Sequence, residues 1–326
     1  MKRKKIGWIT AGALLVLAIV MSIRIGSSRY TWQEFVGGLF RREGYEKVTF
    51  VLYSLRLPRT ASAMLAGVGL SISGVALQNI TGNDLAGPNI IGVNAGAGFL
   101  VIGCMFFRPD WIRFLPAFAF LGAFMTSVII LLIGNTITGK GSAMILAGVA
   151  VTALLNAGIS LISLLDTDVL SGYTDFSVGG LSGNGFDALL IPLVMIIGSV
   201  LVMLVFSEDV DAIMLGGEIA QAVGVNVRVI QLAVILASSA AAGAVVSFAG
   251  LLGFVGLMVP HIAKRLFGVR TKMAVLGSSL TGAIIVLFAD MVGRTLLPGT
   301  EIPAGIVMAF IGVPFFVYLM IRRRAA

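Results

Sequence analysis

The chain has 326 residues, of which 58% are hydrophobic and only 12% charged, and its net charge is +8. Soluble domains carry about 25% charged residues, so this composition excludes a water-soluble enzyme or binding module and indicates a membrane protein. Because the backbone of a segment in lipid must satisfy its own hydrogen bonds, the spanning segments are expected to be helices.

Ten apolar segments follow one another along the chain, most of them close to the roughly 20 residues that span a bilayer. They lie near 6–24, 60–80, 92–107, 113–134, 142–164, 188–206, 228–248, 251–267, 273–290 and 303–321. The eighth is expected to be short or broken, because Gly250 and Gly253 open it and Pro260 interrupts it. The sequence therefore predicts an all-α polytopic membrane protein of about ten transmembrane helices, with residues 1–326 forming a single transmembrane domain.

The basic residues predict the orientation. Residues 2–5 and 322–324 are all basic, and cytoplasmic flanks carry the excess of Lys and Arg, so both termini are expected in the cytoplasm of a multi-pass protein of the cell membrane. The segment 25–59 would then lie outside, although it is rich in Arg and Lys. The positive charge is spread over loops and ends, which favours contact with anionic lipid and gives no support to a nucleic-acid partner.

Two scarce residue types limit the chemistry. One cysteine, Cys104, and one histidine, His261, allow neither a disulfide within the chain nor a Cys/His metal cluster. Cys104 is interpreted as a packing residue, and His261 as an interface or hydrogen-bonding residue rather than a catalytic one. We therefore expect no metal site, no cofactor and no enzyme activity in this chain.

Acidic residues are equally scarce within the predicted spans, where a proton-coupled carrier normally needs one. Asp290 is the exception. It stands near the outer end of its span, four residues before Arg294, so the two can pair on one helix face, either to fix a helix end or to take part in gating. Residues 134–141, GNTITGKG, lack the Ser or Thr that a phosphate-binding loop requires and lie between two spans. Energy for uphill transport is therefore expected from another protein.

Small residues recur at helical spacing in several spans. Gly67 with Ser71, and Gly69 with Ser73, each share a face. Such faces let membrane helices approach closely, and packing is the favoured interpretation. The alternative is the lining of a pathway for a bulky solute, and for that the run of small residues at 238–244 is the better candidate.

The segment 207–228 is predicted to form two short cytoplasmic helices. The first ends at Gly216 and Gly217, and the second is stopped by Gly224. Neither is long enough to span a membrane. The apolar residues of the pair, Ile213, Met214, Ile219 and Val223, are expected to be exposed, which is typical of a docking surface.

Long motifs distributed over nearly the whole chain resemble those of the FecCD-type permeases. They are RLPRT at 56–60, the stretch 67–98, GGLSG at 179–183, LGGEIAQAVGVNV at 215–227, GFVGLMVPHIAKRL at 253–266, DMVGRTL at 290–296 and EIPAGIVMAFIGVPFF at 301–316. These permeases are the membrane subunits of ABC importers for iron–siderophore complexes, haem and cobalamin. One departure is residues 175–178, DFSV, where the family usually has an aromatic-rich pattern before the GGLSG segment.

The resemblance implies a complete set of partners. Two permease subunits, identical or paralogous, would surround a pathway, and spans two to five and seven to ten would form two related halves of opposite orientation. Two cytoplasmic ATP-binding subunits would dock on the short helices, which assigns a coupling role to Leu215, Gly216, Gly217, Glu218, Ala220, Val223 and Gly224. Acidic residues of an external substrate-binding protein would meet Arg56, Arg59 and Arg294. The expected function is import of an iron–siderophore complex by alternating access; cobalamin or haem import, or less strongly a secondary carrier, are the alternatives.

Overall fold

The computed structural model describes residues 2–26, 28, 30–88, 92–136, 142–297 and 299–324, and every regular element within these ranges is a helix. The elements in chain order are α1 (Lys2–Arg24), α2 (Trp32–Leu39), α3 (Glu46–Phe50), η1 (Val51–Arg56), α4 (Leu57–Thr81), α5 (Val93–Phe107), η2 (Pro109–Phe114), α6 (Leu115–Thr136), α7 (Ser142–Leu165), α8 (Thr167–Val178), α9 (Phe186–Val205), α10 (Ser207–Leu215), α11 (Gly217–Ala222), α12 (Val227–Ala249), α13 (Val255–Phe267), α14 (Thr271–Thr295) and α15 (Ala304–Arg324).

Each of the ten predicted apolar segments falls on a helix. Within the described ranges seven stretches are long and apolar enough to cross a membrane: Ile6–Arg24, Glu46–Thr81, Pro109–Ile130, Leu146–Leu165, Phe186–Val205, Val227–Ala249 and Thr271–Thr295. The apolar helices Val93–Phe107 and Ala304–Leu319 are shorter. The eighth segment forms the 13-residue α13, which contains Pro260 and ends before Gly268, as its glycine and proline pattern predicted.

Helix α4 forms the centre of the bundle. It packs against α14, α12, α13 and α9, and most of its residues are buried. Its close neighbours approach through glycine: a Cβ on Gly67 would overlap the backbone of Gly282 in α14, and one on Gly74 would overlap the carbonyl of Gly256 in α13. The packing interpretation of the small residues in this helix is therefore confirmed.

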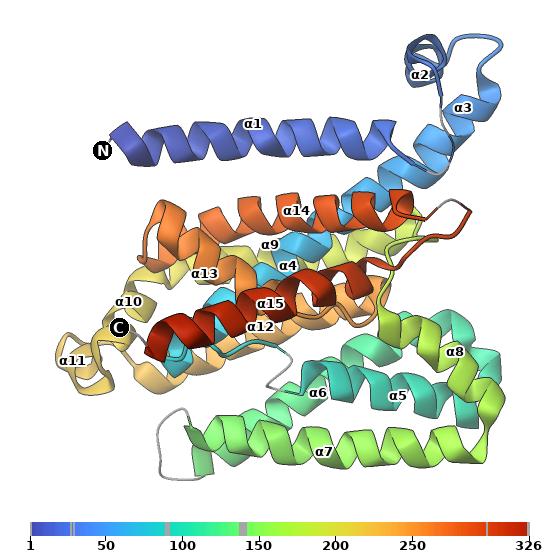
Figure 1. The fold of residues 1–326 in the computed structure, drawn as a ribbon. Helices are drawn as coiled ribbons and strands as arrows, with labels where there is room; N and C mark the ends of the chain where they lie inside the picture. Colours follow the sequence, from blue (N-terminus) through green and yellow to red (C-terminus); the bar gives the residue numbers. More distant parts are fainter. Residues whose placement is uncertain are drawn as a thin grey trace.

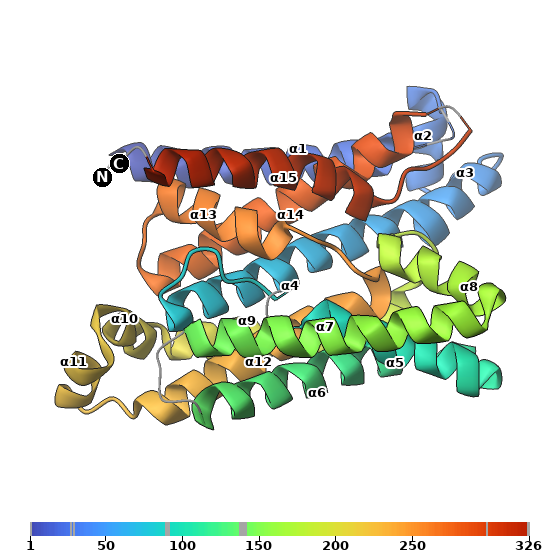
Figure 2. The same ribbon diagram turned by 60° about the horizontal axis from the view of Figure 1, so that its bottom comes forward.

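A second group of helices lies beside this centre. Helices α5, α6, α7 and α8 pack mainly on one another, and α12 joins them to α4 through its contacts with α6 (Figures 1 and 2). The end of α8 is fixed by main-chain hydrogen bonds, because Leu251 N donates to Phe176 O and Gly305 N donates to Gly179 O. The departure at 175–178 therefore lies where the end of α8 meets the α12–α13 connection and the start of α15.

The two ends of the bundle differ in character. The N-terminal end of α1, the C-terminal end of α15 and the pair α10–α11 lie together at one end, whereas α2, α3 and α8 lie at the other (Figures 1 and 2).

Helix α2 starts at a capping box in which Thr31 and Glu34 bond reciprocally. The hydrogen bond from the Thr31 backbone N–H, followed by that from its hydroxyl, lowers the pKa of Glu34.

The entry into α4 is a π-helical turn. Pro58, at the start of α4, has no N–H to donate to the preceding turn, and the widened turn Val51–Arg56 lies immediately before it. Arg56, at the end of this turn, lies against the α1–α2 connection. Arg59 lies in the first turn of α4. Both arginines thus lie at the end of the bundle opposite α10–α11.

Candidate functional site

Four charged side chains form a network where α4 begins and α14 ends; Arg59, Asp290 and Arg294 are largely buried, and Glu301 is exposed. Arg59 Nε lies 2.9 Å from Asp290 Oδ1, and its Nη1 lies 2.6 Å from Glu301 Oε2. Arg294 Nε lies 3.0 Å from Asp290 Oδ2, in charge contact but outside hydrogen-bond geometry. Asp290 is 1% exposed, so one buried carboxylate contacts two guanidinium groups, and Glu301 supplies the second negative charge. The four formal charges sum to zero.

The network extends to α1 through hydroxyl groups. Arg294 Nη2 donates to Ser22 Oγ at 3.0 Å, and Ser22 Oγ lies 2.9 Å from Thr60 Oγ1. Ser22 is fully buried, although α1 has a largely exposed apolar surface. The end of α1 is therefore held to α4 and α14 by polar contacts rather than by apolar packing alone.

Arg56 has a different local role. Its Nη1 donates to the carbonyl oxygens of Ile23 at 3.0 Å and Arg24 at 2.8 Å, and its Nη2 donates to Ser28 O. The last carbonyls of a helix lack partners within the helix, so the guanidinium supplies donors to the end of α1 and favourably meets its dipole. The side chain is 5% exposed.

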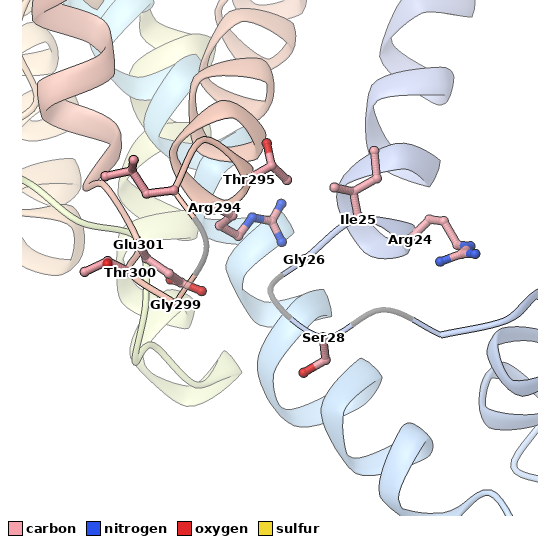
Figure 3. Close-up of a pocket in the computed structure, with 10 residues that line it drawn as sticks. Arg24, Ile25, Gly26, Ser28, Arg294, Thr295, Gly299, Thr300 and Glu301 are labelled. Carbon is pink, nitrogen blue, oxygen red and sulfur yellow. The ribbon is translucent and has the colours of Figure 1, made fainter.

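Two adjoining cavities open at this end. One, of about 770 Å³, lies between the end of α1 and the end of α14, where Arg294 points toward the α1–α2 connection and Arg24 points away from it (Figure 3). The other, of about 530 Å³, is lined by Arg56, Arg59 and Arg294 together, and Glu301 lines both. The fold thus brings the three predicted docking arginines to one cavity.

The three arginines are largely buried. Arg56 and Arg294 are 5% and 4% exposed, and the Arg59 side chain is 13% exposed. Their guanidinium groups contact carbonyls, Asp290 and Glu301 because an arginine this deep requires partners inside the protein. As they stand, they form the wall of a cavity and not an exposed basic patch, and their docking role stays a prediction.

At the opposite end, α10 and α11 form the predicted pair of short helices, separated at Gly216. Four of their apolar side chains are exposed, namely Met214, Leu215, Ile219 and Val223, with exposed fractions of 43%, 72%, 52% and 69%. We call these four residues the coupling surface. Glu218 and Gly217 are exposed beside them, so the pair presents apolar area edged by a carboxylate.

Two residues of the pair are buried: Ile213, which was expected to be exposed, and Ala220, which was assigned a coupling role. Ile213 is 8% exposed and Ala220 is fully buried. Both belong to an apolar cluster with Val210 that packs against residues of α4, α9, α12 and α14. On an amphipathic helix only one face is available to a partner, so these side chains hold the pair on the bundle and do not form part of the coupling surface.

Polar contacts that the sequence did not point to hold α10 in place. Asp211 Oδ1 accepts hydrogen bonds from Thr271 N and Oγ1, and Thr271 Oγ1 accepts one from Asn79 Nδ2. These residues are 60 and 192 positions apart along the chain. Glu301, which bonds Arg59 from 242 positions away, was also missed. No local sequence pattern signals pairs of residues so far apart along the chain.

The remaining candidates have modest surroundings. Cys104 is buried in α5, and the ring of His261 lies edge-on to Phe315 at 6.2 Å. No cluster of His, Cys, Asp and Glu that could hold a metal occurs among the described residues. Of the motif at 134–141, residues 137–141 lie outside the described part of the chain.

These features define a helical membrane protein with a polar cavity at one end and an amphipathic helix pair at the other. The chain belongs to the FecCD transport family, whose sequence profile matches residues 14–322. It is similar to the Fe(3+)-citrate import system permease protein YfmE of Bacillus subtilis (33% identity, covering 98% of this chain and 96% of YfmE). It is also similar to the hemin transport system permease protein HmuU of Yersinia pestis (29% identity, covering 96% and 95%).

A solved structure has the same fold. It is described as an inward-facing conformation of a metal-chelate type ABC transporter, with a TM-score of 0.84, 28% identity, and coverage of 98% of this chain and 99% of that one. The chain is accordingly a multi-pass membrane permease subunit of an ABC importer, a class in which transport rather than catalysis is the role of the subunit.

Proposed function

We propose that the chain forms, with a second permease subunit, the pathway of an importer for an iron–siderophore complex that works by alternating access. Two cytoplasmic ATP-binding subunits drive it, and an external binding protein delivers the substrate. The observation that carries the proposal is the coupling surface, an exposed apolar helix pair in a chain of the FecCD family. A siderophore wraps its metal, so the pathway needs no iron ligands of its own.

The proposed orientation has ten spans and places both termini and α10–α11 in the cytoplasm. Support comes from the basic residues at both ends of the sequence and from the common location of these elements at one end of the bundle (Figure 1). The short helices α5 and α13, of 15 and 13 residues, count as spans in this proposal because backbone at membrane depth is tolerated where it is buried in protein. The two halves of opposite orientation are part of the same proposal.

The name of HmuU favours haem as a second candidate substrate. Both substrates carry their iron already held by an organic chelator, so the chain alone does not discriminate between them. Uptake of a labelled ferric siderophore into vesicles, compared with uptake of labelled haem under the same conditions, separates the two. Uptake of haem without uptake of the ferric siderophore would replace the first proposal with the second.

The energy source gives the direct test of the function. In liposomes that contain the chain with its partner subunits, uptake is expected to require ATP and to stop when vanadate is added. The reason is that Asp290, the buried acidic residue of the described long helices, is already paired with two arginines, whereas a proton-coupled carrier needs an acidic site of its own within the membrane. Uptake by the isolated chain under a proton gradient, with no ATP, would overturn the importer proposal in favour of a carrier.

The coupling surface gives a second prediction. Changing Val223 to Glu introduces a charge into the proposed ATPase contact and is expected to lower ATPase co-purification about tenfold or more, because a central apolar contact is worth roughly 1–2 kcal/mol and a buried unpaired charge costs more. Val269 is the matched control, since it is equally exposed, at 69%, but lies on the α13–α14 connection outside the coupling surface. Equal loss in Val223→Glu and Val269→Glu would contradict this assignment.

The external binding protein is proposed to dock over the cavity lined by Arg56, Arg59 and Arg294. Support comes from their convergence on one cavity. The external segment 25–59 is also rich in basic residues, which the positive-inside rule does not explain. Focused positive potential raises the encounter rate with an acidic partner even where the charges are recessed. Because reversing any of these arginines would break internal bonds, a charge-balanced variant is the sharper probe.

A further inference from the structure

The N-terminus of α14 is capped by a side chain of another helix. Asp211, in α10, accepts from the backbone N–H of Thr271 at 2.8 Å and from its hydroxyl at 2.6 Å. Arg270, at the N-cap position of α14, makes no capping bond through its own side chain. A carboxylate that accepts helix N–H groups is both a hydrogen-bond partner and a favourable charge at the positive end of the helix dipole. Asp211, a residue of α10, therefore supplies the side-chain cap that the residues at the start of α14 do not supply themselves.

The contact continues into the central helix. The Thr271 hydroxyl donates its proton to Asp211 Oδ1. Its oxygen accepts a hydrogen bond from Asn79 Nδ2 at 2.9 Å. Thr271 is fully buried and Asn79 is 1% exposed. The direction of every bond is fixed, because a carboxylate only accepts and an NH₂ group only donates. One hydrogen-bonded chain thus joins α10 to the start of α14 and to the end of α4.

Helices α4 and α14 are also fastened elsewhere along their length. Ser71 Oγ, in α4, donates to Ser278 O of α14 at 2.9 Å in the middle of the pair, and Arg59 meets Asp290 at the opposite end. The 25 residues of α14 extend about 37 Å at 1.5 Å per residue. The Asp211 contact and the buried charge network are therefore at the two ends of one braced pair of helices.

We propose that Asp211 is a positioning residue for energy coupling, which transmits displacement of α10–α11 to the α4–α14 pair. The apolar cluster around Val210 and Ile213 also holds α10, but apolar contacts are non-directional and permit sliding. A charge-assisted bond to a helix terminus fixes register. This inference rests on the proposed function, because the motion at α10–α11 is that of a bound ATPase.

The test uses the complete transporter in liposomes, with both ATPase subunits and the binding protein loaded with ferric siderophore. The measured quantities are ATPase co-purification, the rate of ATP hydrolysis and the substrate moved per ATP. Asp211→Ala is expected to keep ATPase assembly and hydrolysis, yet to lower the substrate moved per ATP by about tenfold, within the usual range of coupling between sites. Asp211→Asn keeps the accepting Oδ1 and is expected to retain most of the coupling.

Glu208→Ala is the matched control, because it removes an exposed acidic residue from the same helix, and it is expected to match the parent. Thr271→Val and Asn79→Ala, which remove one link each, provide the result if Asp211→Ala assembles poorly, and each is expected to lower the ratio less. The inference is overturned if Asp211→Ala moves as much substrate per ATP as the unaltered transporter. If Asp211→Ala does not assemble, the same result in Thr271→Val and Asn79→Ala overturns it. Absence of ATP-driven uptake by the unaltered transporter would overturn the proposed function as well, so the two failures can be told apart.

Discussion

Asp290→Asn is expected to lower the free energy of unfolding by about 4 kcal/mol, which is the scale of removing one partner from a buried ion pair. The change leaves Arg59 with Glu301 but deprives Arg294 of its counter-charge, at a position that is 4% exposed. Removing the charge also weakens the contact between α4 and α14. The measurement is the midpoint of thermal unfolding of the purified protein in detergent, followed by size-exclusion chromatography.

A charge-balanced double variant serves as the control. Asp290→Asn combined with Arg294→Gln restores neutrality in the network, and is expected to recover more than half of the lost stability because no unpaired buried charge remains. If the double variant is less stable than Asp290→Asn, the two side chains contribute independently and the ion-pair explanation is wrong. The same double variant tests docking, because it removes a cavity arginine without unbalancing the interior. A faster dissociation from the binding protein is expected because a local contact group is lost, whereas the association rate should change little because the net charge is the same as in the parent.

Gly74→Ala is expected to destabilise the protein by about 3 kcal/mol, at the upper end of the range for overpacked cores. The added methyl would overlap the carbonyl of Gly256, and a backbone atom of a packed helix cannot move aside as a flexible side chain can. Relief requires that α4 and α13 separate. The measurement is again the thermal midpoint, together with the yield of protein that elutes as a single species.

Gly198→Ala is the matched control for this variant. Gly198 lies within α9, another long apolar helix, and a Cβ there would meet nothing within 4 Å. Because Ala is the better helix former by about 1 kcal/mol, this variant is expected to be neutral or slightly stabilising. Similar losses in Gly74→Ala and Gly198→Ala would show that the effect comes from glycine as such and not from the close approach of α4 to α13.

Those parts of the fold that depend on local pattern could be predicted from the sequence. Apolar length located the apolar helices, and Gly216 and Gly224 located the ends of α10 and α11, because each is a property of neighbouring residues. The exposure of Ile213 was mispredicted for a tertiary reason. Its apolar side chain was expected to face a partner, but the helix instead buries it against α4, α9, α12 and α14, and a short helix does not show from its sequence which face the bundle covers.

The candidate site was predictable to a similar degree. The spacing of Asp290 and Arg294 allowed a pair on one helix face, and an ion pair with 3.0 Å between Arg294 Nε and Asp290 Oδ2 exists between them. The sequence did not indicate that Arg59 shares the same carboxylate, since 231 residues separate the two. Likewise, the docking role of Arg56 came from the family resemblance, whereas its nearest partners are main-chain carbonyls of α1, which no sequence pattern distinguishes.

The shared carboxylate of Asp290 has a consequence for the order in which the chain is built. Arg294 and Asp290 belong to one helix, so α14 enters the bilayer with this charge already compensated. Arg59 is synthesised 231 residues ahead of Asp290. Until α14 is inserted, Arg59 has to stay near the membrane surface, where a long side chain reaches water. The N-terminal end of α4 is therefore fully buried only after α14 has been inserted, and insertion of this late helix completes the packing around α4.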